Sequence, residues 1–126
     1  MGKKVLLAED YADTRQMMRF MLESFGYEVV EARDGYEALL AAEKDCPDLV
    51  LMDIAMPIMN GITSATLIRA LDNCRDIPIV AVTAFCDQYV ESSSDFGFDY
   101  VMEKPVDIDE LRRVVDEHMS AAAAEA

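Results

Sequence analysis

Apolar residues follow two different patterns along the chain. Short segments rich in apolar residues are typical of strands, and they occur at residues 4–8, 27–32, 47–53, 77–84 and 99–105. Between them, apolar residues recur at helical spacing and predict amphipathic helices at 12–26, 34–46, 60–73, 88–97 and 107–119. Because the run at 47–53 is continuous rather than alternating, we expect this strand to be covered on both faces.

The predicted strands and helices alternate from one end of the chain to the other. Parallel strands joined by single helices form a sheet with helices on both of its faces. The pattern therefore predicts a doubly wound α/β fold with a five-stranded parallel sheet and five helices. In such a fold ligands bind beyond the carboxyl ends of the strands, so the residues that follow each strand are the candidates for function.

Local signals refine the predicted helices. In the first helix, Met17 and Met21 lie on one stripe that we expect to pack in the core, and Gly26 stands where a helix commonly ends. Asp34 is suited to cap the second helix at its N-terminus. The fourth predicted helix is weak, because its three consecutive serines compete for backbone hydrogen bonds.

The length of the chain, 126 residues, allows one domain. A hydrophobic content of 52% is enough to build its core without disulfides or a structural metal. We assign residues 1–119 to the domain. The alanine-rich end, residues 120–126, is interpreted as a disordered tail or linker stub.

The cysteines and the N-terminus indicate the compartment. Cys46, Cys74 and Cys86 show neither C-x-x-C nor Cys/His metal spacing, so we expect free thiols in a reducing compartment. No apolar run approaches the roughly 18 residues of a membrane span. The first residues are not a secretion signal, because their short apolar part ends in two acids. These features together predict a cytoplasmic protein.

The charge of the chain restricts its partners. Lys and Arg total 11 and Asp and Glu total 25, which gives a formal net charge of −14. Such a charge opposes direct binding to nucleic acid phosphates or to an anionic membrane surface. It suits partners that are basic or that bring a cation.

Five polar residues follow the predicted strands at one edge of the sheet. Glu9 and Asp10 follow the first strand, Asp53 ends the third, Thr83 ends the fourth, and Lys104 follows the fifth. Three neighbouring carboxylates repel one another unless a cation intervenes, and Lys104 supplies only one charge. Mg²⁺ suits a site of two carboxylates and waters, so the pattern predicts a magnesium site.

Magnesium beside a lysine and a hydroxyl is an arrangement that handles phosphate. The chain has neither a G-x-x-x-x-G-K-[ST] loop nor a G-x-G-x-x-G segment to hold a nucleotide. The nucleophile would then belong to the protein. Asp53, at the end of the central strand, is the candidate, since an aspartate can form an acyl phosphate.

At these positions the sequence resembles a known family. The segments LLAEDYAD, LVLMDIAMPIMNG, VAVTAF and EKPVD, in this order, resemble the receiver domain of two-component response regulators, in particular single-domain, chemotaxis-regulator-like members. The resemblance covers roughly residues 3–118. It implies a flavodoxin-like sheet with strand order 2-1-3-4-5.

The resemblance also implies a role for each residue of the acidic site. Asp53 would accept a phosphoryl group from a phosphohistidine on a sensor histidine kinase or phosphotransfer protein. Asp10 and Asp53 would bind Mg²⁺ directly, together with the main-chain carbonyl of Ala55, while Glu9 would act mainly through a bound water. The domain would catalyse only its own phosphorylation and dephosphorylation.

On the other side of the site, the resemblance implies that Thr83 binds a phosphoryl oxygen. Lys104 would pair with the phosphoryl group and, before phosphorylation, with Asp53. The peptide bond between Lys104 and Pro105 is expected to be cis.

The chain departs from the family pattern in its fifth strand. Val101 stands where the family usually has an aromatic residue that moves with the threonine, and Tyr100 comes one residue early. One residue along a strand means the opposite face of the sheet. We therefore expect the usual coupling between threonine and aromatic residue to be weakened, rather than the strand to shift its register.

Other functions stay open at this point. A hydrolase of free aspartyl-phosphate substrates would need a second acid two residues after Asp53, where this chain has Ala55. The chain could also be a receiver excised from a larger regulator or hybrid kinase, or a pseudo-receiver that serves only as a scaffold. Our first interpretation is a stand-alone switch, a monomer or weak dimer, that signals through a downstream protein effector.

Overall fold

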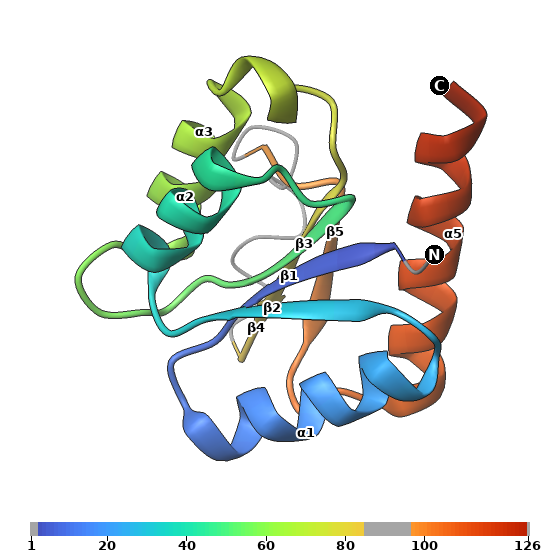
Figure 1. Ribbon diagram of the computed structural model, residues 1–126. Helices are drawn as coiled ribbons and strands as arrows, with labels where there is room; N and C mark the ends of the chain where they lie inside the picture. The colour runs from blue at the N-terminus through green and yellow to red at the C-terminus, as the bar shows by residue number, and fades with distance from the viewer. Residues whose placement is uncertain (1–2, 85–96, 126) are drawn as a thin grey trace.

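A five-stranded parallel sheet forms the centre of the molecule (Figure 1). The structure is a computed structural model that describes residues 3–84 and 97–125. The strand order is β2-β1-β3-β4-β5, and every neighbouring pair is parallel. The predicted doubly wound α/β fold is therefore confirmed. The strands are β1 (Lys4–Ala8), β2 (Glu28–Ala32), β3 (Leu49–Asp53), β4 (Ile79–Thr83) and β5 (Tyr100–Glu103).

Helices cover both faces of this sheet. In Figure 1, α2 and α3 lie together on one face, and α1 and α5 lie on the other. The predicted helix at 88–97 falls almost entirely outside the described residues. Within those residues the α-helices are α1 (Ala12–Ser24), α2 (Gly35–Lys44), α3 (Gly61–Arg69) and α5 (Ile108–Glu125), and a 3₁₀ turn, η1 (Asp72–Cys74), follows α3.

Each face of the sheet has its own hydrophobic core. All five residues of β3 and all five of β4 are buried, as expected for strands covered on both sides. The face under α1 and α5 is filled from the helices by Met18, Leu22, Leu111, Val114 and Val115. The face under α2 and α3 is filled from the helices by Ala38, Ala42, Ala65 and Ile68.

The core-facing stripe of α1 differs from the prediction. Met17 is 44% exposed, whereas Met18 and Leu22 are fully buried and Met21 packs only partly against the core. The expectation that Met17 lies in the core was wrong. Two adjacent stripes of this helix are apolar, and the position of α1 on the sheet selects the one that contains Met18 and Leu22.

The helix ends follow the local sequence. The backbone of Gly26 has φ of +96°, and Tyr27 N donates to Leu22 O at 3.1 Å, which closes α1. Asp34 caps α2 as predicted, because its side chain accepts from Glu37 N at 2.8 Å.

Two helices end at other residues than predicted. The helix α3 ends at Arg69 rather than near residue 73, and the last part of the predicted helix belongs instead to the 3₁₀ turn η1. The helix α5 runs to Glu125, beyond the predicted domain boundary at 119. The interpretation of 120–126 as a tail or linker stub stays a prediction.

Two of the cysteines are paired. A disulfide joins Cys46, just after α2, to Cys74, the last residue of η1, with their Cα atoms 5.8 Å apart. The expectation of free thiols was wrong for these two residues, because 28 positions of sequence separation gave no sign that the fold brings them together. Cys86 lies outside the described residues.

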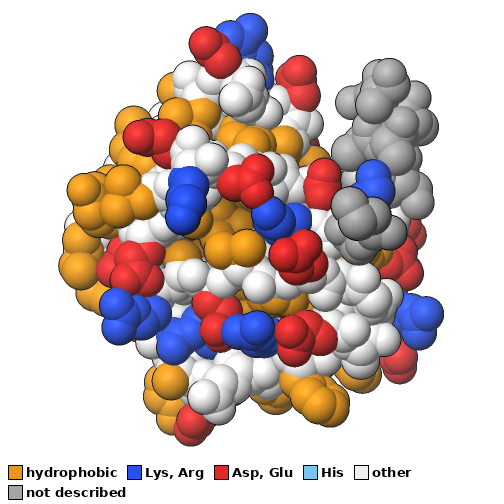
Figure 2. Space-filling view, in the orientation of Figure 1, with side chains coloured by type: hydrophobic (Ala, Val, Ile, Leu, Met, Phe, Trp, Pro, Cys, Tyr) orange, Lys and Arg blue, Asp and Glu red, His pale blue; other side chains and the backbone are white. Residues whose placement is uncertain are grey.

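Acidic and basic side chains are interspersed across the face that Figure 2 shows, with hydrophobic side chains between them. On α1 and β2 these groups form ion pairs, in which Arg15 and Arg19 both contact Glu31. None of the helices in the described part of the chain is long and apolar enough to span a membrane.

Candidate functional site

The five predicted polar residues converge at the carboxyl edge of the sheet. Glu9 and Asp10 directly follow β1, Asp53 and Thr83 are the last residues of β3 and β4, and Lys104 directly follows β5. The register of the sheet aligns these strand ends, since Asp53 pairs with Val82 and Thr83 with Glu103. Parallel strands thus deliver all five side chains to one place.

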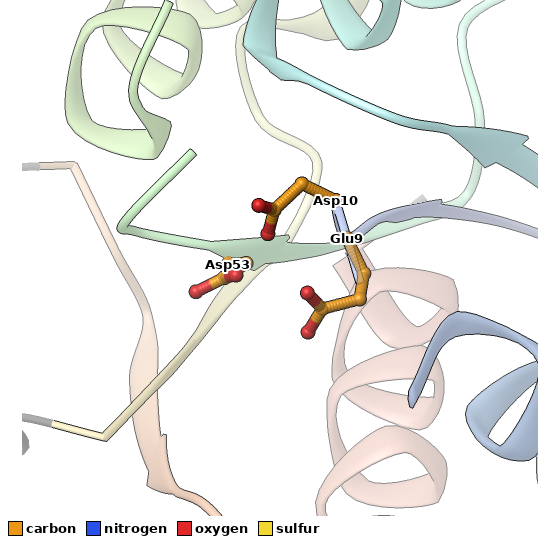
Figure 3. A group of neighbouring side chains, drawn as sticks. All are labelled: Glu9, Asp10 and Asp53. Atoms are coloured by element: carbon orange, nitrogen blue, oxygen red, sulfur yellow. The ribbon is translucent and has the colours of Figure 1, made fainter. Parts of the chain in front are cut away.

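Three carboxyl groups form the centre of the site. One oxygen each of Glu9, Asp10 and Asp53 lies within 4.8 Å of the other two. Figure 3 shows the three carboxyl groups gathered beside the strand that carries Asp53. Glu9 and Asp53 are almost completely buried, at 1% and 4% exposure, while Asp10 is exposed. Solvent therefore reaches the cluster from the side of Asp10.

Lys104 bridges the two buried acids. Its Nζ lies 2.7 Å from Glu9 Oε1 and 3.2 Å from Asp53 Oδ2. The second oxygen of Glu9 accepts from Tyr11 N at 3.1 Å, and Arg15 donates to the Glu9 carbonyl at 2.8 Å. The contacts of Lys104 and Tyr11 with its two carboxylate oxygens hold the Glu9 side chain in this orientation, while Arg15 holds its main chain.

The charges of the site perturb its pKa values. Burial and the nearby charge of Glu9 raise the pKa of Asp53 to about 7, although the charge of Lys104 acts in the opposite direction. Burial alone would lower the pKa of Lys104, but its contacts with Glu9 and Asp53 outweigh burial and raise that pKa. The single ammonium group of Lys104 therefore does not neutralise the three carboxyl groups. A bound cation would supply the missing positive charge.

The cluster fits Mg²⁺ in its chemistry. Carboxylate oxygens are hard ligands, and Mg²⁺ commonly takes one or two of them and keeps several waters. Asp10 and Asp53 would hold such an ion, and the exposure of Asp10 leaves room for water. Ala55, whose carbonyl is the further expected ligand, follows Asp53 by two residues and is exposed.

Two glycines that were not among the predicted site residues let the loop after β3 pass close to the site. A Cβ at Gly61 would lie 2.2 Å from the Asp53 carbonyl oxygen, and one at Gly35 would lie 2.1 Å from the Met59 carbonyl oxygen. Gly61 N also donates to Ile54 O at 2.8 Å. Gly61 is the first residue of α3, directly after the N-cap Asn60, although glycine is unfavourable in helices. This unfavourable glycine was the feature of the sequence that could have indicated a close backbone contact.

The two remaining predicted residues, Tyr100 and Val101, face opposite sides of the sheet. Tyr100 packs against the core under α1 and α5, where its ring lies 5.9 Å from that of His118 in an edge-on arrangement. Val101 packs against the core under α2 and α3. The peptide bond between Lys104 and Pro105, which follows β5, is cis.

The family model of the response regulator receiver domain matches residues 5–116 of this chain. The chain belongs to the receiver domain family. Receiver domains are generally switches in two-component signalling rather than enzymes that turn over a free substrate. The predicted family and strand order are thus both confirmed.

Curated relatives match over nearly their full length. A protein of Leptolyngbya boryana, described only as an uncharacterised 14.6 kDa protein, is 36% identical over 118 residues, covering 93% of this chain and 90% of its own. The polar-differentiation response regulator DivK of Brucella anthropi is 32% identical over 123 residues, covering 97% of this chain and all of its own.

Solved structures share the fold. The receiver domain of a sensor histidine kinase from Pseudomonas aeruginosa superimposes with a TM-score of 0.89 at 33% identity, covering 95% of this chain and 99% of its own. That structure has a magnesium ion coordinated in its active-site cleft. A CheY-like receiver protein from Methanospirillum hungatei gives a TM-score of 0.90 at 26% identity, with both chains fully covered.

Proposed function

We propose that this chain is a phosphorylatable switch that accepts a phosphoryl group on Asp53. The observation that carries the proposal is the position of the Asp53 carboxylate, which lies within 4.8 Å of carboxyl oxygens of Glu9 and Asp10 and 3.2 Å from Lys104. A buried carboxylate beside a lysine and a potential cation site is suited to attack phosphorus and to keep the resulting acyl phosphate.

The step is an in-line displacement at phosphorus. An Asp53 oxygen forms the new P–O bond, the P–N bond to the donor histidine breaks, and its electron pair leaves with the imidazole. Lys104 stands where it can exchange its contact with Asp53 for one with a phosphoryl oxygen. Thr83, buried at the end of β4, is the proposed hydroxyl donor to another phosphoryl oxygen.

Mg²⁺ is the cofactor that we propose for this site. It would be held by Asp10, Asp53 and the Ala55 carbonyl, with Glu9 acting through a bound water. When bound, the ion supplies the positive charge that phosphoryl oxygens need in the transition state. The acid cluster and its deficit of positive charge support this assignment.

The proposed partners are proteins. A phosphohistidine on a sensor histidine kinase or phosphotransfer protein supplies the phosphoryl group, and a downstream effector protein responds to it. The net charge of −14 speaks against nucleic acid or an anionic membrane as the direct target. We propose a cytoplasmic protein that acts as a monomer or weak dimer through residues 1–119.

Transmission from the site is proposed to differ from the usual pattern. Val101 cannot swing an aromatic ring toward Thr83, and Tyr100 packs toward α5 instead. The coupling between threonine and aromatic residue is therefore proposed to be weak in this chain.

Uptake of beryllofluoride, a stable mimic of the phosphoryl group, and of acetyl phosphate tests the proposal. In the presence of Mg²⁺, the wild-type protein should bind the first and gain one phosphoryl mass from the second. Asp53→Asn should do neither, while Asp109→Asn, at an exposed position of α5, should behave as wild type. If wild-type protein took up neither reagent, the scaffold interpretation would replace the switch.

A further inference from the structure

The disulfide between Cys46 and Cys74 lies at the end of the sheet opposite the acidic site. Cys46 precedes β3 and Asp53 ends it, so the length of this strand separates the two features. In Figure 1, the connections from α2 to β3 and from α3 to β4 both return to the end of the sheet where the N-terminus lies. The disulfide ties these two connections together.

The two cysteines of the disulfide differ in their exposure. Cys74, the last residue of η1, has 0% exposure, whereas Cys46 is only half-buried. A cavity of about 390 Å³ opens beside Cys46 and is not lined by Cys74. Because thiol–disulfide exchange requires direct attack on a sulfur, an incoming thiolate can reach Cys46 but not Cys74.

The cavity carries mixed charge with an acidic excess. Its lining contains two basic residues, Lys3 and Arg75, and three acidic residues, Asp48, Asp72 and Asp76. Arg75 is already paired with Asp72 at 3.3 Å. Since the whole chain is also strongly acidic, the potential around Cys46 favours a small cationic molecule over an anionic one.

We propose that Cys46 is a site of reversible modification by small aminothiols. The aminothiol's thiolate forms a bond to Cys46 Sγ, the bond between Cys46 and Cys74 breaks, and its electron pair leaves on Cys74 Sγ, which takes up a proton. A second aminothiol releases Cys46 as a thiol and leaves as the small disulfide. The same small disulfide, acting as oxidant, reverses both steps.

The modification gives the chain a covalent input that is separate from Asp53. Opening the disulfide removes the covalent link between η1 and the segment that follows α2. It leaves the acidic site and Lys104, at the other end of the sheet, unchanged. Loss of a cross-link that closes a loop of 28 residues should lower the melting temperature by on the order of 10 °C.

Mass spectrometry of Cys86→Ser protein tests the proposal, because that variant keeps only Cys46 and Cys74. The folded, non-reduced protein is treated with cysteamine, which is cationic, or with glutathione, which is anionic, and is then quenched in acid and peptide-mapped. We expect the adduct on Cys46 with a free thiol at Cys74. At low ionic strength cysteamine should react roughly tenfold faster than glutathione. Adducts on Cys74, equal rates for both thiols, or absence of the disulfide before treatment would each overturn the proposal.

Two further variants separate chemistry from folding. In the Cys86→Ser background, Cys74→Ser should still take up cysteamine from cystamine at Cys46, whereas Cys46→Ser should stay unmodified until it is unfolded. Equal modification of both folded variants would contradict the exposure argument. Beryllofluoride uptake at Asp53 should be the same before and after opening of the disulfide, so failure of this proposal and failure of the proposed switch are measured independently.

Discussion

The α-carbon of Gly61 lies directly against the main-chain carbonyl of Asp53. A Cβ added at Gly61 would come within 2.2 Å of that oxygen and within 2.9 Å of the Ile54 Cα. Both neighbours are backbone atoms, so neither can move without moving the end of β3. The glycine thus sets how closely the loop between β3 and α3 passes the proposed phosphorylation site.

Gly61→Ala should therefore damage the site as well as the fold. Overpacking of this kind costs about 1–3 kcal/mol, and the displaced backbone should weaken beryllofluoride binding at Asp53. Urea unfolding and beryllofluoride titration measure the two effects. Gly26→Ala is the matched control, because Gly26 has φ of +96° with nothing within 4 Å of its added Cβ. That variant should lose about 1 kcal/mol and keep its ligand affinity; similar affinities for both variants would argue against a positioning role for Gly61.

Lys104→Met should increase the affinity of the site for Mg²⁺. The ammonium group contacts Glu9 and Asp53 and so competes with any other cation for the same oxygens. Without Mg²⁺, the variant leaves two buried carboxylates without their partner, which costs at most roughly 3–5 kcal/mol. The affinity of Lys104→Met for Mg²⁺ should exceed that of the wild-type protein by on the order of tenfold.

Thermal unfolding at increasing Mg²⁺ concentration tests this, since a ligand of the native state raises the melting temperature with its affinity. Lys44→Met, at an exposed lysine near the end of α2, serves as the control and should match wild type. A larger magnesium response in wild type than in Lys104→Met would contradict the competition between the ammonium group and the metal.

Most of the site could be predicted because it depends on strand ends. Runs of apolar residues mark where strands stop, and parallel pairing brings those ends together whatever the details of packing. What could not be predicted depends on contacts between distant elements. The sequence offers both Met17 and Met18 for the core, and only the position of α1 on the sheet decides between them. The pairing of Cys46 with Cys74 and the contact of Gly61 with Asp53 arise in the same way, from loops that meet only in the folded chain.

The stability of the metal-free protein should depend on the ionisation of Asp53. Its pKa is raised to about 7 in the folded state, while an unfolded aspartate titrates near about 3.9. The protonated form is thus favoured by folding. The stabilisation is complete below about pH 4 and is lost as the pH rises through about 7.

Urea unfolding in a chelator between pH 4.5 and 8 measures this dependence. Relative to Asp53→Asn, wild-type protein should lose stability over the range, and saturating Mg²⁺ should remove most of the loss because the ion binds the deprotonated carboxylate. Parallel pH profiles for the two proteins without Mg²⁺ would show that Asp53 does not carry the shifted pKa.

Tyr100 should keep its packing when the site is occupied. Its ring contacts that of His118 on α5, and the neighbouring Tyr100 hydroxyl is the main cause of the raised pKa of the Arg113 guanidinium. On addition of beryllofluoride and Mg²⁺, we expect nuclear Overhauser contacts between the Tyr100 and His118 rings to persist, while the methyl signals of Val101 shift. Disappearance of the Tyr100 contacts on activation would instead assign the switching role to this tyrosine.

Ile58, in the loop between β3 and α3, has a positive φ, a backbone conformation that glycine or asparagine adopts more easily. Its φ is +68°, and Met59 N donates to Pro57 O at 2.7 Å across it, which makes Ile58 the centre of a three-residue turn. A β-branched residue is strained in this region at a cost of order 1–3 kcal/mol, and with 84% exposure Ile58 gains little from burial. Ile58→Asn should therefore stabilise the protein by about 1 kcal/mol in urea unfolding, because asparagine tolerates positive φ. Ile58→Val keeps the branched Cβ and should unfold like wild type; equal stabilisation by both variants would mean that loss of exposed apolar surface, and not relief of strain, explains the gain.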